Sequence, residues 1–284
     1  MISIITPSFG QIDWLRLALA SVFDQEGVDV EHIVQDAGSK GIDQLLSKIG
    51  SSVDARHKTT LIIEKDSGMY DAVNRGLQRS GGEICAYLNC DEQYLPGALS
   101  RVVAAFQANP QIDVLLAGTV VVDGDGQYLC SRPALIPQLR ELQAGRMYNL
   151  TSSIFFHSRL FRDRNFFFDP TLRIVGDLDW LRRVMAGGAR VEVLNAFTST
   201  FSDLGTNLAL SQSASVEIDP AKHKRTLSSR ISHSALLASH RLRRVLAGHY
   251  SQPPFDYSIY TLGDDRKRKT FRVEKPTGVW RNRL

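Results

Sequence analysis

The chain begins as an alternation of short apolar runs and amphipathic stretches. Each apolar run ends in a turn marked by Gly, Pro, Asp or Asn, which is typical of buried strands. The expected strands are Ile2–Ile5, Ile33–Val34, Leu61–Ile63 and Ile84–Leu88. The stretches between them carry apolar residues at helical spacing, as over residues 69–79. Strands separated by helices predict an α/β fold, a mostly parallel central sheet with helices on both faces.

Polar residues follow these strands directly. The clusters are Thr6-Pro7-Ser8, Asp36-Ala37-Gly38-Ser39, Lys65-Asp66 and Asn89-Cys90-Asp91-Glu92. In a parallel sheet the carboxyl ends of the strands meet at one edge, and ligands bind beyond that edge. We therefore expect the four clusters to form one site.

The pattern becomes less regular after residue 117. Val120–Val122, a Gly-Asp turn and Tyr128–Leu129 predict a hairpin, and a helix is expected from Asp177 to Met185. Another long helix is expected from Glu217 to Ala247. The sequence thus predicts one domain over residues 1–215, with halves at 1–117 and 118–215, and a helical, basic C-terminal extension over 216–284.

Composition places the chain among ordinary globular proteins. It is 43% hydrophobic and 23% charged, which excludes disorder, and no apolar run reaches the roughly 18 residues that cross a bilayer. The first residues lack the features of a signal peptide, and the three cysteines are an odd number without a CxxC motif. We therefore expect a cytoplasmic protein without disulfides.

Charge is unevenly distributed along the chain. Residues 221–284 contain 15 Lys and Arg against 4 Asp and Glu, whereas residues 1–220 contain 19 against 26. A basic tail on an acidic body has two interpretations. It binds phosphates, on nucleic acid or on an anionic membrane, or it packs against the acidic body. The tail lacks interleaved aromatic residues and recognition motifs, so no nucleic acid is expected.

Carboxylates at three places in the chain are candidates for chemistry: the pair Asp91 and Glu92, Asp36, and Asp177. Each place also has a purely structural interpretation. Asp91 and Glu92 offer hard oxygen ligands for Mg²⁺ or Mn²⁺, or they simply form a turn. Asp36 accepts hydrogen bonds from a nucleotide base or ribose, or it forms an Asx-turn. Asp177 is expected to cap the helix that follows, which is its structural interpretation. It could serve in chemistry as well if its second carboxylate oxygen faces a cleft.

Several common enzyme classes are excluded by missing motifs. The first strand is not followed by GxGxxG, and the chain contains no GxxxxGK[ST] and no GxSxG. The histidines form no HExxH motif and no zinc spacing with cysteine. A dinucleotide-binding Rossmann domain, a P-loop NTPase, an α/β-hydrolase and a zinc enzyme are therefore not expected.

The order of the motifs resembles family 2 glycosyltransferases with the GT-A fold, especially the bacterial branch that builds surface polysaccharides. The resemblance covers roughly residues 1–200, and its most specific part runs from Glu64 to Glu92. The matching segments are Ser3–Phe9, Val34–Ser39, Glu64–Gly76, Gly82–Ile84, Leu88–Glu92 and Gly176–Arg182.

The resemblance implies roles for individual residues. Thr6, Pro7, Ser8, Asp36, Asp66 and Asn89 would surround the nucleotide of a nucleotide-sugar donor, with UDP favoured. Asp91 would bind the Mn²⁺ or Mg²⁺ ion that bridges the donor diphosphate. Asp177 would be the general base that deprotonates the acceptor hydroxyl, and transfer would invert the anomeric centre. Residues 1–117 would then bind the nucleotide sugar, and 118–215 the acceptor.

The sequence departs from the family pattern in places. Asn89 replaces the first acid of the DxD motif, Gly176 replaces the acid that often precedes the base, and Thr151-Ser152 stands where relatives often carry His-Gln. Asp91 and Asp177 are retained, so we expect an inverting, metal-dependent hexosyltransferase of polysaccharide biosynthesis. The alternative is a non-catalytic nucleotide- or sugar-binding partner in a polysaccharide-assembly complex.

The resemblance also gives the basic tail a use. Acceptors of such enzymes are often lipid-linked sugars, so Arg241, Arg243, Arg244 and Arg266–Lys269 are expected to hold the protein peripherally on the cytoplasmic membrane face. Each basic residue near an anionic surface contributes about 1 kcal/mol.

Overall fold

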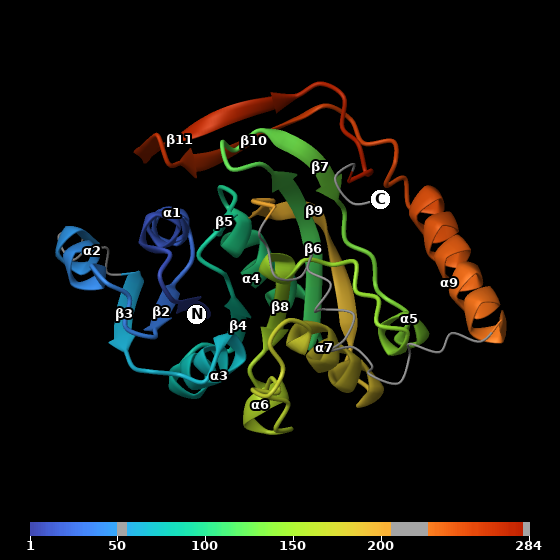
Figure 1. Ribbon diagram of the computed structural model, residues 1–284, viewed down its shortest axis with the longest axis horizontal. Helices are drawn as coiled ribbons and strands as arrows, with labels where there is room; N and C mark the ends of the chain where they lie inside the picture. Colours follow the sequence, from blue (N-terminus) through green and yellow to red (C-terminus); the bar gives the residue numbers. More distant parts are fainter. Residues whose placement is uncertain (50–55, 206–226, 281–284) are drawn as a thin grey trace.

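The computed structural model describes residues 1–49, 56–205 and 227–280. A nine-stranded sheet runs in the order β3-β2-β1-β4-β8-β6-β9-β5, with β7 paired to β6 (Figure 1). Its strands are β1 (Ile2–Ser8), β2 (Val30–Asp36), β3 (His57–Ile63), β4 (Ile84–Tyr87), β5 (Glu92–Tyr94), β6 (Val114–Val122), β7 (Tyr128–Arg132), β8 (Ile154–His157) and β9 (Val191–Ser202). The helices of this part are α1 (Ile12–Phe23), α2 (Ile42–Ile49), α3 (Met69–Arg79), α4 (Ala98–Ala108), α5 (Leu139–Gln143), α6 (Arg159–Arg162) and α7 (Gly176–Ala186), with a 3-10 turn at Thr151–Ser153.

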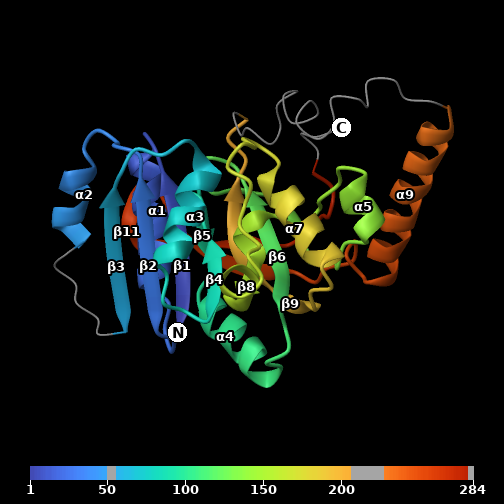
Figure 2. The ribbon, with the colours of Figure 1, turned by 90° about the horizontal axis from the view of Figure 1, so that it is seen from below.

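The first four strands of this order are parallel, as the sequence predicts. Strands β3, β2, β1 and β4 lie side by side and point the same way (Figure 2). Ser8 pairs with Asp36, and Asp36 pairs with Ile63, so β1, β2 and β3 end level with one another. Antiparallel pairs occur further along, where β8 lies between β4 and β6. The predicted hairpin of β6 and β7 is confirmed.

Alternation along the strands explains why helices cover both faces of the sheet. Ile4 and Ala86 point to one face, where they pack with residues of α1 and α4. Their neighbours Ile5 and Tyr87 point to the other face, where they pack with residues of α3 and α7. Successive strand residues face opposite ways, so a fully apolar strand needs cover on both sides. Figure 1 shows α1 and α3 on opposite sides of these strands.

The C-terminal extension is only partly helical, which corrects the sequence-based expectation. Helix α9 (Leu227–Leu246) is followed by an antiparallel hairpin of β10 (Phe255–Thr261) and β11 (Asp264–Val273). The expected start of the helix at residue 217 lies outside the described residues, as does the proposed domain boundary at 215. Apolar residues alternate with polar ones in β10 and at the end of β11. Their buried members Tyr257, Ile259, Phe271 and Val273 pack with Leu95 and Val120.

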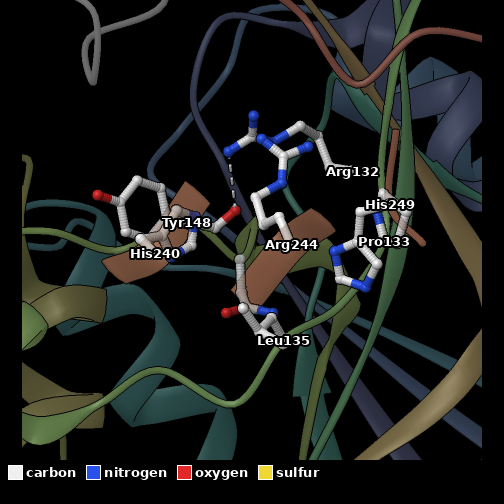
Figure 3. Close-up of a pocket in the computed structure, with 8 residues that line it drawn as sticks. Arg132, Pro133, Leu135, Tyr148, His240, Arg244 and His249 are labelled. Atoms are coloured by element: carbon white, nitrogen blue, oxygen red, sulfur yellow. Dashed lines mark hydrogen bonds between the residues drawn. The ribbon is translucent and has the colours of Figure 1, made fainter. Parts of the chain in front are cut away.

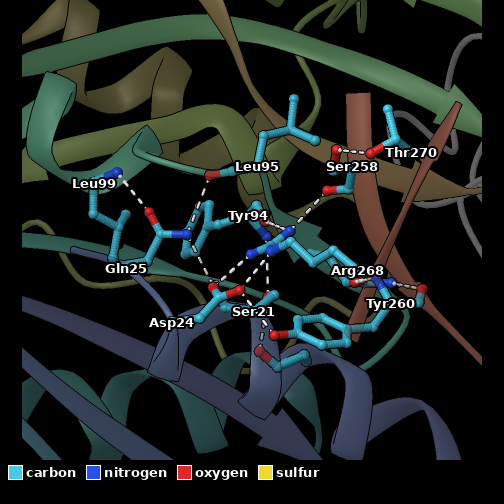
Figure 4. Close-up of polar contacts among 12 residues, drawn as sticks. Ser21, Asp24, Gln25, Tyr94, Leu95, Leu99, Ser258, Tyr260, Arg268 and Thr270 are labelled. Carbon is cyan, nitrogen blue, oxygen red and sulfur yellow. Dashed lines mark hydrogen bonds and ion pairs between the residues drawn. The ribbon is translucent and has the colours of Figure 1, made fainter. Parts of the chain in front are cut away.

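Arg268 fastens this hairpin to the rest of the molecule (Figure 4). Its guanidinium group binds both carboxylate oxygens of Asp24, at 2.5 and 2.6 Å, and donates to the carbonyl oxygens of Tyr94 and Ser258. Arg243 similarly binds Glu141, at 3.2 Å. These two residues were expected to face a membrane; instead, they pack against the acidic body, the other interpretation of the basic tail.

None of the helices in the described part of the chain combines the length and the apolar composition that a membrane span requires.

Candidate active site

The polar clusters predicted from the sequence do gather at one edge of the sheet. The backbone N–H of Ala37 donates to the Ser8 carbonyl, which ties the ends of β1 and β2 together. The Cys90 thiol contacts the Pro7 carbonyl at 3.4 Å, which brings the segment after β4 to the same place. Parallel strands that end in register therefore assemble the site, as expected.

The residues at the C-terminal end of β1 differ in what they offer a ligand. The Thr6 side chain is buried, and its hydroxyl lies 2.8 Å from Nε2 of His32, so it is occupied within the protein. Burial lowers the pKa of His32 to about 3, so the imidazole is neutral. Ser8 is buried beside the Cys90 thiol. Phe9, which the sequence analysis did not single out, is 72% exposed at this edge.

Asp36 is an organiser of the loops, as the Asx-turn interpretation predicts. Its Oδ1 accepts hydrogen bonds from the backbone N–H groups of Gly38 and Ser39, at 2.9 and 2.6 Å. Its Oδ2 accepts from the Ser39 hydroxyl, which in turn accepts from the N–H of Gly10. Asp36 is fully buried and fixes the two loops that follow β1 and β2. Contact with a nucleotide stays a prediction.

Asp66 lies partly buried in the loop after β3. Its Oδ1 accepts a hydrogen bond from the N–H of Gly68 at 2.9 Å. Burial raises the pKa of Asp66, and the nearby carboxylates of Asp71 and Asp36 act in the same direction. Asp36 and Asp66 are therefore electrostatic neighbours, which agrees with the predicted position of Asp66 beside the same loop.

The segment after β4 forms a tight turn that separates its two acids. The N–H of Asn89 donates to Oε2 of Glu92 at 2.9 Å, and Glu92 is almost completely buried. Burial, followed by the charge of Asp91, raises the pKa of Glu92 to about 8. Glu92 thus supports the turn instead of facing a ligand, and Asp91 is the acid left partly exposed.

Asp91, Glu92 and Asp177 create a negative region at this edge. Burial raises the pKa of Asp91, and the charge of Asp177 also raises the pKa of Glu92. Such a region attracts a cation, although no three Asp, Glu, His or Cys side chains of the described residues are arranged to hold a metal alone.

Asp177 is held in the first turn of α7, where Val175 takes the cap position. The Thr151 hydroxyl donates to its Oδ2 at 2.8 Å, and the N–H of Leu178 donates to its Oδ1 at 2.8 Å. Burial raises the pKa of Asp177, while these donors lower it. The expected helix cap is therefore wrong, but the carboxylate is fixed by its neighbours.

A pocket opens beside this carboxylate. Its lining residues are Tyr87, Thr151, Ile154, Phe156, Phe168, Asp177 and Trp180. Trp180 is buried in the core and donates from its indole N–H to the Phe166 carbonyl. Asp177 is the acidic group in a largely aromatic pocket, which explains why its charge is poorly solvated.

Two departures from the family pattern have structural reasons. A Cβ atom on Gly176 would lie 2.5 Å from the Tyr70 ring, so glycine permits Tyr70 to approach α7. The Tyr70 hydroxyl then accepts a hydrogen bond from the N–H of Asp177 at 3.2 Å. Thr151 contacts Asp177 directly. Sequence reasoning missed both partners because 107 and 26 residues separate them from Asp177.

Known proteins are similar to this chain in sequence over part of their length. A glucosyltransferase of Campylobacter jejuni, named GalNAc(5)-diNAcBac-PP-undecaprenol beta-1,3-glucosyltransferase, is 30% identical over 102 residues, 36% of this chain and 33% of that protein. The succinoglycan biosynthesis protein ExoO of Rhizobium meliloti is 26% identical over 203 residues, 68% of this chain and 58% of that protein. The matched region spans less than two thirds of either relative.

Solved structures share the fold. S. aureus TarS, residues 1–349 in complex with UDP, superposes with a TM-score of 0.56 at 20% identity, over 71% of this chain and 60% of that one. The mannosyltransferase PcManGT of Pyrobaculum calidifontis, solved with GDP-Man and Mn²⁺, gives a TM-score of 0.54 at 14% identity, over 74% and 57%. The expected GT-A fold is therefore confirmed.

The model of the family described as glycosyl transferase family 2 matches residues 3–167, which is more than half of the sequence. The chain belongs to glycosyl transferase family 2.

Proposed function

We propose that this chain transfers a sugar from a nucleotide-sugar donor to a hydroxyl group of a glycan or lipid-linked acceptor, with inversion at the anomeric carbon. The observation that carries the proposal is the setting of Asp177. Its carboxylate is held by Thr151 beside a pocket and belongs to the same negative region as Asp91. Relatives named for succinoglycan and teichuronic acid biosynthesis support a bacterial polysaccharide as the product.

Asp177 is suited to remove a proton from the acceptor. A general base works best when its pKa approaches the working pH, and burial raises the pKa of this carboxyl. Thr151 and the N–H of Leu178 fix its orientation, so the acceptor hydroxyl meets an oxygen in a defined position. As the acceptor oxygen attacks the anomeric carbon, its proton passes to Asp177 and the bond to the diphosphate breaks.

The loops after β1 and β2 are the proposed nucleotide site. Asp36 fixes both loops, and exposed Phe9 offers a flat surface on which a base can stack. TarS was solved with UDP and with UDP-GlcNAc, and PcManGT with GDP-Man. These neighbours support a nucleoside diphosphate sugar as donor, and we favour UDP.

Asp91 is the proposed metal ligand. It supplies one hard oxygen ligand, so a Mn²⁺ or Mg²⁺ ion would need oxygens of the donor diphosphate to complete its coordination. A cation there would stabilise the negative charge that develops on the leaving diphosphate. The acidic surroundings of Asp91 fit such an ion, and PcManGT was solved with Mn²⁺.

Turnover of nucleotide sugars by wild type and Asp177→Asn tests the proposal. General base catalysis contributes about 10²- to 10⁴-fold, so we expect a loss of kcat in that range with nucleotide binding retained. Asp163→Asn is the matched control, because Asp163 is exposed and does not line the pocket beside Asp177. Nucleotide binding without turnover by wild type would favour the non-catalytic binding partner instead.

A further inference from the structure

A second pocket lies between the catalytic domain and the C-terminal extension (Figure 3). One wall is the segment from the end of β7 to the 3-10 turn, and the other is α9 with the residues after it. The pocket is lined by Arg132, Pro133, Leu135, Tyr148, Asn149, His240, Arg244 and His249. It contains none of the residues of the proposed donor site or of the pocket beside Asp177.

This second pocket carries positive charge without an acid in its lining. The guanidinium groups of Arg132 and Arg244 lie next to each other (Figure 3). Burial and the charge of Arg244 both lower the pKa of Arg132, so the two groups repel. Glu141 lies behind the lining, where it binds Arg243 at 3.2 Å and accepts from the N–H of Gln138 at 2.7 Å. Both contacts involve Oε2 of Glu141, whereas its Oε1 faces His240.

The pocket also contains buried nitrogen atoms that lack hydrogen-bond partners. His240 and His249 are 5% and 7% exposed, and within the described residues neither Nε2 of His240 nor Nδ1 of His249 has a hydrogen-bond partner. Nδ1 of His240 lies 3.3 Å from Oε1 of Glu141. Arg132 donates one long hydrogen bond within the described residues, to the Tyr148 carbonyl at 3.5 Å. Buried polar groups normally have partners, so these atoms point to a ligand.

We propose that this pocket binds a phosphate or diphosphate group. Two guanidinium groups provide permanent charge and forked donors that match phosphate oxygens. The two imidazoles can each take up a proton and add charge when an anion enters. A metal cation is unsuitable, because both arginines would repel it. The free space is narrow in this conformation, so a phosphate has to part the two arginine side chains, which already repel each other.

The position of the pocket suggests where that phosphate belongs. Tyr148 and Asn149 line it, and Thr151, two residues further along, donates to Asp177. The pocket therefore borders the acceptor side of the site, and a phosphorylated acceptor is the fitting occupant; this assignment rests on the proposed function. Helix α9 also exposes Leu242, Val245 and Leu246, so a lipid-borne phosphate is tested separately from a soluble one.

The first test is calorimetric titration of the full chain with inorganic diphosphate in EDTA. Chelation removes the metal that a nucleotide diphosphate site would need. We expect Arg132→Gln and Arg244→Gln to weaken binding at least tenfold, and Arg101→Gln, an exposed arginine of α4, to leave it unchanged. Asp91→Ala should also leave it unchanged. Equal weakening by Asp91→Ala and Arg132→Gln would place the anion at the donor site and overturn the proposal.

A second measurement does not depend on how the variants fold. In wild type, burial lowers the pKa of His240 to about 4 and also lowers the pKa of His249. A bound phosphate favours the charged imidazoles, so both pKa values should rise in NMR titrations with diphosphate. Affinity should accordingly increase as pH falls through the raised values. Histidine resonances that do not respond to saturating diphosphate would overturn the proposal.

The source of the phosphate is decided with vesicles. One set of vesicles contains a polyprenyl diphosphate, and the control set contains phosphatidylcholine alone. If wild type sediments only with the first set, and Arg132→Gln abolishes this sedimentation, the site binds a lipid-borne group. Binding of soluble diphosphate with no such sedimentation would assign it to a soluble phosphate. Binding of neither would overturn the proposal. These readouts do not involve sugar transfer, so a failure of the proposed function would be seen separately, in the turnover of Asp177→Asn.

Discussion

At the scale of single residues, the environment of Asp177 determines what its carboxylate can do. The sequence marked Asp177 as a candidate, but its surroundings come from distant segments, Tyr70 before it and Thr151 between them. Sequence spacing predicts neighbours within a helix or strand, not contacts across the sheet. Asp36 shows the opposite case, because its partners lie two and three residues away and the Asx-turn was predictable.

The hydroxyl of Thr151 should control the pH at which Asp177 ionises. It donates to the charged carboxylate and so lowers its pKa, against the effect of burial. Thr151→Val removes the donor, and the pKa of Asp177 should rise. The acidic limb of the kcat profile should then move to higher pH. Thr151→Ser keeps the hydroxyl and should keep the wild-type limb; an unmoved limb in Thr151→Val would contradict this role.

Gly176 provides the close contact between α7 and Tyr70. Gly176→Ala places a Cβ atom 2.5 to 2.8 Å from ring atoms of Tyr70, so the ring or the helix must shift. We expect a loss of about 1–3 kcal/mol in the free energy of unfolding, measured in urea, together with reduced turnover. Gly263→Ala is the control, because a Cβ there meets nothing within 4 Å. Equal stability of the two variants would show that the contact is not tight.

At the scale of elements, the N-terminal half was predictable because each strand is a continuous apolar run that ends in a polar turn. The sequence analysis did not predict β10 and β11. In β11 the four consecutive basic residues 266–269 interrupt the alternation of apolar and polar residues, which is visible only at Phe271 and Val273. The buried ends of this hairpin become apparent only when they pack with Leu95 and Val120. The described part of the extension is therefore a helix followed by a hairpin. The helical spacing in the first half of the extension did not predict the hairpin.

Arg268 should be the main polar anchor of that hairpin. Its side chain is 11% exposed and binds Asp24 and the backbone carbonyls of Tyr94, Ser258 and Ser21. Arg268→Met removes this donor from all four acceptors and should cost about 2–3 kcal/mol of unfolding free energy in urea. Arg272→Met is the matched control on the same strand, because Arg272 is 54% exposed and should change the unfolding midpoint little. If both substitutions lowered the free energy of unfolding by similar amounts, Arg268 would not be the main polar anchor of the hairpin.

At the scale of the whole molecule, much of the basic charge of the C-terminal extension is paired with acidic residues of the same chain. Arg268 binds Asp24, Arg243 binds Glu141, and Arg16 binds Asp265, so the extension and the body attract each other. Arg244 is buried in the second pocket. The residues of the proposed membrane surface that stay exposed are Arg241, Arg266, Lys267 and Lys269. Association with an anionic membrane would therefore depend on fewer charges than the sequence suggests.

Binding of a nucleoside diphosphate at the carboxyl edge of the sheet is the central claim of this account. The most direct test is calorimetric titration of UDP, GDP and dTDP, each with and without Mn²⁺, on wild type and Asp91→Ala. We predict that one nucleotide, with UDP favoured, binds wild type with Mn²⁺, and that omission of Mn²⁺ or the Asp91→Ala substitution weakens binding at least tenfold. Binding of none of the three under any condition would contradict the account.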